Sequence, residues 1–147
     1  PDQILSKTGP LNEKEWEIMR QHPVIGHDLL SHIEFLKQAI DIPKYHHEKW
    51  DGSGYPEGLK GQEIPLSARI FAIGDVWDAL RSDRPYRKAM SEDQARIVLA
   101  HSHNSHFDPM VYKAFIRLLN EGAFNFYGAD DFNNISEIQQ SILAHTV

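Results

Sequence analysis

The apolar residues of this chain recur at helical spacing, and nowhere do they alternate with polar residues as in a half-buried strand. The clearest helical stretch runs from about Ser67 to Ser82, with apolar side chains on one face. The chain shows no internal repeat, low-complexity stretch or second domain. The sequence therefore predicts one all-α domain over residues 1–147, in which 123–147 form a C-terminal tail or helix.

Several helix ends are marked by local capping signals. Asn12 with Glu15, and Ser91 with Gln94, have the spacing of a capping box, in which each residue bonds the other's backbone N–H. Proline suits the first turn of a helix and glycine suits the position after its end. Such residues mark further starts and a stop at Pro23, Asp108-Pro109 and Gly122.

Two segments between these helices contain residues that interrupt a helix. A helical segment is predicted from Phe35 to Glu48, and Pro43 implies a kink or restart within it, because proline lacks an N–H and clashes with the preceding turn. From Trp50 to Leu66 glycine and proline are too dense for any regular element. This loop contains Gly52, Gly54, Pro56, Gly58, Gly61 and Pro65.

Composition excludes several classes of protein. A hydrophobic fraction of 41% is enough for a core, and the absence of cysteine excludes disulfides and thiolate metal sites. We find no apolar run long enough to span a bilayer and no secretory leader, so we expect a cytoplasmic protein. The net charge of -6 argues against a nucleic-acid polymer as partner, but a small phosphate ligand needs only a few local cations.

Four residues are candidate metal ligands: His22, the pair His46-His47, and Asp75. Imidazole and carboxylate together suit divalent iron, manganese or zinc. A histidine before proline is also common as a simple helix-end residue, and a histidine pair is often part of the surface. Asp75 is harder to explain in this way, because an unpaired carboxylate in an apolar helix is costly to bury. The residues alone leave a metal site and a structural role about evenly matched.

The stretch from His46 to Leu59 closely resembles the signature of HD-GYP domains, a branch of the HD phosphohydrolase superfamily. The resemblance covers roughly the first 118 residues, in order. It continues through Ile64–Ile70, Asp75–Leu80, Arg84–Arg87 and Phe107–Pro109.

This resemblance implies a helical bundle of the HD phosphohydrolase type that holds two or three divalent metal ions, with iron or manganese favoured and zinc open. It implies hydrolysis of cyclic di-GMP to a linear dinucleotide or GMP. It also implies roles for particular residues. Metal ligands would be His22, His46, His47 and Asp75; substrate contacts would be Asp78, Arg84 and Arg87; and the loop motif Gly54, Tyr55 and Pro56 would serve substrate access and contacts with GGDEF-domain proteins.

The sequence departs from the family pattern at its beginning. It starts just after the place where the family carries its His-Asp pair and a nearby lysine. We therefore expect a bundle truncated at its N-terminus and little activity from this chain alone, and we assign no catalytic residue. The alternative is a degenerate module that binds cyclic di-GMP or docks GGDEF proteins without turnover. A phosphohydrolase for another nucleotide is a weaker reading, because the Gly54–Pro56 motif is retained.

Two remaining features have no assigned role in catalysis. His101, His103 and His106 are interpreted as a polar helix end. The tail carries Ile135, Ile138 and Ile142 at helical spacing, a face that a partner or a second copy of the chain could cover.

Overall fold

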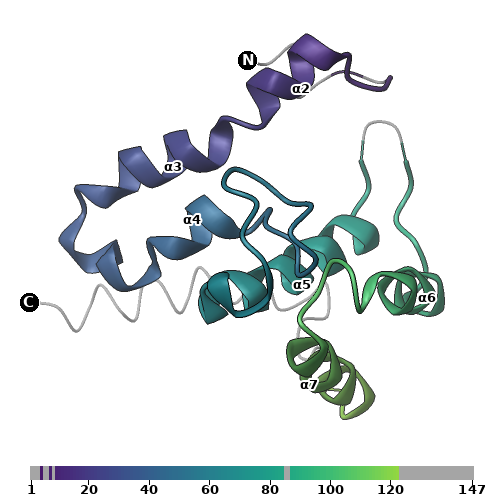
Figure 1. Ribbon diagram of the computed structural model, residues 1–147. Helices are drawn as coiled ribbons and strands as arrows, with labels where there is room; N and C mark the ends of the chain where they lie inside the picture. Colours follow the sequence, from purple (N-terminus) through teal and green to yellow (C-terminus); the bar gives the residue numbers. More distant parts are fainter. Residues whose placement is uncertain (1–3, 5–6, 8, 85–86, 123–147) are drawn as a thin grey trace, which may run out of the picture. The chain divides into compact units, whose positions relative to one another are not determined.

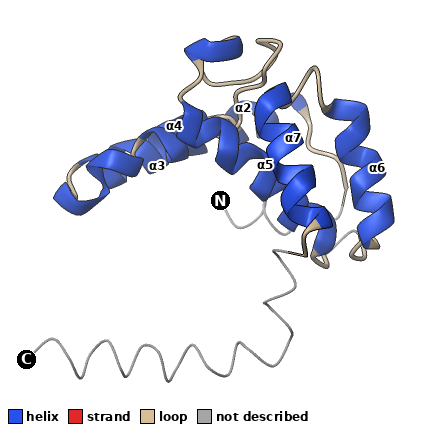
Figure 2. Cartoon of the chain, turned by 90° about the horizontal axis from the view of Figure 1, so that it is seen from below, coloured by secondary structure: helices blue, strands red, loops and turns tan. Residues whose placement is uncertain are grey.

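The computed structural model describes residues 4, 7, 9–84 and 87–122. Contacts divide the chain into two compact units, Pro1–Tyr112 and Lys113–Val147, and each is considered by itself. The described residues form helices and loops without a strand, which confirms the all-α prediction (Figure 2). The predicted tail 123–147, with its isoleucine face, lies outside the described residues, and the assignment of one domain to 1–147 stays a prediction.

Consecutive helices of the first unit pack on one another. Helix α3 packs on α4, α4 on α5, and α5 on α6 (Figure 1). No helix in the described ranges is long and apolar enough to cross a membrane. The helices are α2 (Glu13–Met19), α3 (His22–Ser31), the 3-10 helix η1 (Glu34–Ala39), α4 (Asp41–Tyr45), the 3-10 helix η2 (Gly61–Glu63), α5 (Leu66–Arg81), α6 (Glu92–Ser102) and α7 (Pro109–Asn120).

The capping signals act as predicted. The Asn12 side chain accepts from the Glu15 N–H at 3.0 Å, and the Glu15 carboxylate accepts from the Asn12 N–H at 2.7 Å. Ser91 and Gln94 form the same reciprocal pair at the start of α6. Because each pair satisfies donors that the first helical turn leaves unpaired, both helices begin where the sequence indicated.

The restart that Pro43 predicts within the segment after α3 is confirmed. The chain forms η1 and then restarts as α4 at Asp41, two residues before Pro43. Pro43 lies in the first turn of α4, where the helix does not need a backbone N–H. The proline therefore lies where a new helix begins and does not interrupt an existing one.

The buried core of the first unit lies between α5, α6 and the turn before α7. Small Ala68 and Ala72 let the neighbouring elements approach α5 closely, and Ile73 completes the buried face, whereas Ile70 is 53% exposed. Asp108, only 5% exposed, pairs with the Arg69 guanidinium and accepts from the Met110 N–H, which ties α5 to the start of α7. Other buried apolar residues among those described in this unit include Ile64, Ala95, Leu99 and Phe107, as well as Pro23 in α3.

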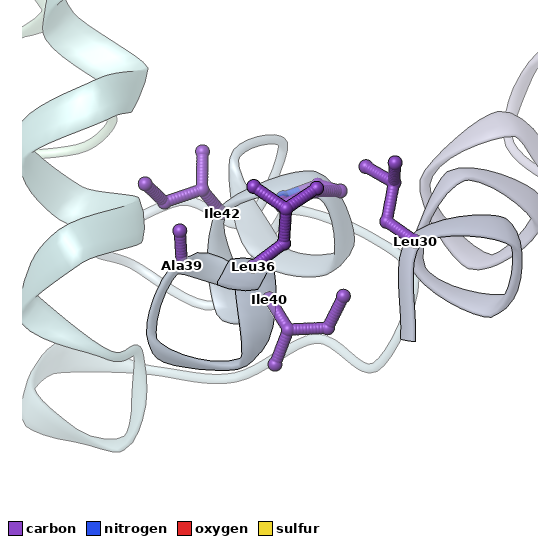
Figure 3. A pocket seen from close by; sticks show the side chains of 6 residues that line it. Leu30, Leu36, Ala39, Ile40 and Ile42 are labelled. Carbon is purple, nitrogen blue, oxygen red and sulfur yellow. The ribbon is translucent and has the colours of Figure 1, made fainter. Parts of the chain in front are cut away.

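A small cavity of about 180 Å³ lies where the end of α3, η1 and α4 meet (Figure 3). Its lining contains no titratable side chain, so it offers no group for acid–base or metal chemistry. The lining residues are Leu30, Leu36, Ala39, Ile40, Ile42 and Pro43.

Candidate metal centre

Three histidines converge at the junctions of α2 with α3 and of α4 with the following loop. One ligand nitrogen from each of His22, His46 and His47 lies within 4.8 Å of the other two. The Nε2 atoms of His22 and His47 are 3.1 Å apart. The structure thus brings together three of the four predicted metal ligands, from positions 25 residues apart in the chain.

Two of these rings are oriented by backbone carbonyls. His22 Nδ1 lies 2.6 Å from the Met19 carbonyl oxygen, and His46 Nδ1 lies 3.0 Å from the carbonyl oxygens of Ile42 and Pro43. Because a carbonyl only accepts, each Nδ1 carries the hydrogen and each Nε2 keeps a lone pair. This is the arrangement in which proteins orient a histidine to bind a metal ion.

The third ring is kept neutral by its surroundings. Burial, together with the neighbouring His46 and His22, lowers the pKa of the His47 imidazole to about 3. A neutral imidazole can give a lone pair to a metal, whereas a protonated one cannot. His47 is therefore available as a ligand throughout the neutral range.

The separation of the His22 and His47 nitrogens fits a shared divalent transition-metal ion. Two nitrogens that each bind one ion at about 2.0–2.1 Å lie roughly 2.9–3.4 Å apart, for ligand angles between 90° and the tetrahedral value. The 3.1 Å between His22 and His47 lies within that range. Imidazole ligands suit iron and zinc among other ions, so the donor set does not distinguish between these metals.

A cavity of about 850 Å³ opens beside this cluster, lined by His22 and His47 but not by His46. Asp75, on the middle of α5, is partly buried and lines the cavity, although it lies outside the three-histidine group. The structure therefore places the carboxylate on the same cavity as the imidazoles. The remaining lining residues are Ile4, Lys7, Gly9, Pro10, Leu11, Trp16, Met19, Tyr55, Ala79, Arg84 and Arg87.

The predicted substrate-binding residues differ in their surroundings. Arg84 and Arg87 face each other across an antiparallel bridge, and both line the cavity. The exposed Arg84 forms no ion pair among the described residues, whereas Arg87 donates to the carbonyls of Ala79, Leu80 and Lys88. Asp78 is exposed, accepts from the Ser82 hydroxyl at 3.5 Å, and does not line the cavity. Its role in substrate binding stays a prediction.

The loop motif packs directly against the histidine pair. A Cβ added to Gly54 would lie 2.4 Å from the Glu48 Cα and 2.6 Å from the His47 carbonyl oxygen, so only glycine fits there. The Tyr55 N–H donates to that same carbonyl at 3.2 Å, and the Tyr55 ring centroid lies 4.9 Å from that of His47. The position of the motif is thus coupled to the position of His47, a predicted metal ligand.

Glu48 holds this loop in place, a role that the sequence did not reveal. Its side chain is among the most buried polar groups, with the residue 2% exposed. Its carboxylate accepts from the backbone N–H groups of Glu57, Gly58 and Leu59 at 2.7–3.0 Å. Three charge-assisted bonds compensate for burying the charge and connect the histidine pair to the far side of the loop. The only available signal was a charged residue directly after two candidate ligands.

Comparisons with known proteins identify the family of this chain. A family model described as "HD domain" matches residues 1–111. A "Probable cyclic di-GMP phosphodiesterase" of Vibrio cholerae is 47% identical over 124 residues, covering 79% of this chain and 28% of the relative. The "Cyclic di-GMP phosphodiesterase response regulator RpfG" of Xanthomonas campestris is 46% identical over 119 residues, covering 80% of this chain and 32% of the relative.

A solved structure is similar in fold. The crystal structure of a cyclic GMP-AMP specific phosphodiesterase of Vibrio cholerae, V-cGAP3, matches with a TM-score of 0.63 and 22% identity, over 78% of this chain and 26% of that chain. The chain belongs to the HD domain family, and the HD-GYP resemblance of its sequence is confirmed. It spans about a third or less of the length of the curated relatives it matches.

Proposed function

We propose that this chain forms the metal-binding and phosphate-binding part of a cyclic di-GMP phosphodiesterase. The observation that supports this most directly is the convergence of His22, His46 and His47 beside a cavity that Asp75 and Arg84 also line. A cyclic dinucleotide carries two anionic phosphodiesters, so its site needs both metal ligands and fixed cations. We propose two or three divalent ions in the complete site, with iron or manganese preferred.

Each residue at this cavity would have a distinct role. The histidines and Asp75 would hold the metal, and a bound divalent ion supplies positive charge to a phosphodiester and makes water more acidic. Arg84 would hold a phosphate oxygen pair through its planar fork of donors. Lys7, which pairs with Glu15 and lines the same cavity, adds a second cation. Arg87 would act indirectly, by fixing the bridge that it forms with Arg84, because its own donors hold the end of α5.

The choice of substrate is supported by the relatives. The Vibrio cholerae and Xanthomonas campestris relatives are named as cyclic di-GMP phosphodiesterases, and the structural neighbour is specific for cyclic GMP-AMP. Both compounds are cyclic dinucleotides that contain guanine. We propose cyclic di-GMP as the substrate, with GGDEF-domain proteins as partners of the Tyr55 loop and a homodimer through the tail as further proposals.

Turnover of cyclic di-GMP with added manganese tests this function. The native protein that carries this chain should release linear dinucleotide or GMP, and the His46→Ala, His47→Ala double variant should not. The 147-residue chain alone should turn over far more slowly than the intact Xanthomonas relative assayed beside it. Absence of hydrolysis by the native protein would contradict the proposed phosphodiesterase activity. Binding of cyclic di-GMP without turnover would support the degenerate module instead.

A further inference from the structure

Trp16 is a large aromatic residue that the metal chemistry does not use. It is 43% exposed, yet it lines the cavity that contains His22, His47 and Asp75. An indole that faces a ligand cavity with an open ring surface can stack on a planar heterocycle, because every nucleobase has a π face. The ring is therefore placed to contact a base while the phosphates lie near the histidines.

Arg20 does not line the cavity itself, but it lies next to the Trp16 and Tyr55 rings, which both do. Its guanidinium carbon is 5.9 Å from the ring centroid of Trp16 and 5.9 Å from that of Tyr55. Within the described part of the chain no carboxylate forms an ion pair with it. A guanidinium held at aromatic faces keeps its in-plane N–H donors free for a ligand. Two such donors match the paired acceptors O6 and N7 of guanine, a pair that adenine does not present.

Both residues are held by the same junction that orients a metal ligand. The Arg20 N–H donates to the Trp16 carbonyl at 2.9 Å, in the last turn of α2. The Met19 carbonyl between them in sequence accepts from His22 Nδ1. A base bound at Trp16 and Arg20 would thus have a fixed position relative to the metal centre.

We propose that Trp16 and Arg20 form a guanine-binding subsite, in which Trp16 stacks on the base and Arg20 donates to O6 and N7. The subsite rests on the proposed function, since it takes one base of a cyclic dinucleotide whose phosphates lie at the metal centre. It determines specificity for guanine over adenine and takes no part in bond cleavage.

Equilibrium binding of cyclic di-GMP and cyclic di-AMP to the full chain tests the subsite without relying on turnover. Trp16→Leu should weaken cyclic di-GMP binding roughly 5- to 150-fold and abolish the tryptophan fluorescence change on binding, whereas Trp16→Phe should retain most of the affinity. Arg20→Gln should reduce the preference for cyclic di-GMP over cyclic di-AMP by a similar factor. Ile18→Ala and Lys14→Gln are matched controls on the same helix; Ile18 is 44% exposed and lines no part of the cavity.

The possible results separate the subsite from the proposed function. If wild type binds cyclic di-GMP and the Trp16 and Arg20 variants bind it as tightly and as selectively, the subsite is overturned and the phosphodiesterase proposal stands. If the control substitutions weaken binding as much as Trp16→Leu, the loss of affinity reflects a general disturbance of α2, and the subsite is again overturned. If wild type binds neither dinucleotide, the subsite and the cyclic di-GMP proposal both fail.

Discussion

The cavity beside the metal centre has two walls that are built in different ways. His22 and His47 line the histidine wall, backbone carbonyls orient His22 and the adjoining His46, and Glu48 fixes the loop that follows His47. On the arginine wall, a short antiparallel bridge joins Arg84 and Arg87, and the exposed Arg84 guanidinium has no carboxylate partner among the described residues. The first wall has its geometry set by the fold before any ion binds, whereas the second keeps a charge available for a ligand.

The largest effect should come from Gly54→Ala on the histidine wall. The new methyl group would overlap the Glu48 Cα and the Lys49 nitrogen at 2.4 Å, and backbone atoms cannot move aside as a flexible side chain can. We expect the free energy of unfolding to fall by about 3 kcal/mol, at the upper end of overpacking effects. Urea denaturation provides the measurement.

Gly74→Ala is the matched control for this substitution. Gly74 lies within α5 and a Cβ there would meet nothing within 4 Å. Alanine should therefore stabilise the protein by up to about 1 kcal/mol through helix propensity. A Gly54→Ala protein as stable as wild type would show that the loop does not lie against the histidine pair.

Glu48→Gln should have the next largest effect. The neutral amide keeps the shape but loses the charge, and its NH₂ group cannot accept from the loop N–H groups, so we expect a loss of about 1.5–3 kcal/mol. Glu57→Gln, at an exposed residue paired with Lys44, should cost about 0–1 kcal/mol. Equal losses for the two variants, measured in urea, would mean that Glu48 does not organise the loop.

The hydrogen bonds of the Asn12 capping box and of Glu48 show which contacts can be predicted from a sequence and which cannot. Capping boxes such as Asn12 with Glu15 were predictable, because their partners are three residues apart and act locally. Glu48 was not, because it bonds to amides nine to eleven residues later, which only the folded loop brings close. The restart near Pro43 was also predictable, because proline is tolerated in the first turn of a helix, although its first residue, Asp41, was not.

The same limit applies to the candidate site. The family signature pointed to His22, His46 and His47, and the structure brings them together. The signature could not distinguish Arg84 from Arg87, because that difference depends on which guanidinium reaches the end of α5. Their assignment to substrate binding stays a prediction, and the structure shows that the two guanidinium groups have different surroundings.

Substitutions on the arginine wall should separate stability from binding. Arg87→Lys should lower the free energy of unfolding by about 1–2 kcal/mol, because lysine cannot reproduce the fork that holds the α5 carbonyls. Arg84→Ala should change stability by less than about 0.5 kcal/mol but weaken cyclic di-GMP binding. Thermal melts and equilibrium binding of cyclic di-GMP, measured on both variants, test this difference. A loss of stability in Arg84→Ala without one in Arg87→Lys would contradict the different roles of the two arginines.

A smaller effect is expected from His106, whose carbonyl accepts from the Trp50 N–H and so anchors the loop. Burial lowers the pKa of the His106 imidazole, and Lys49 lowers it further. The unfolded chain therefore binds a proton from about pH 6.5 downward, before the folded protein does, and stability falls as the pH drops below that value. With chelator present, His106→Gln should show a shallower fall in urea denaturation than wild type. Identical pH dependence would contradict a buried, neutral His106.

The central claim is that the histidine wall is a metal site whose geometry the fold sets in advance. Calorimetric titration of the chain with manganese and with zinc, at pH 7.5, tests it most directly. The His46→Ala, His47→Ala variant should lose more affinity than the roughly 10- to 100-fold that removal of an outer hydrogen-bond partner costs. His32→Ala, at the exposed C-cap of α3, should bind as wild type does. Equal metal binding by the double variant and wild type would mean that these histidines are structural.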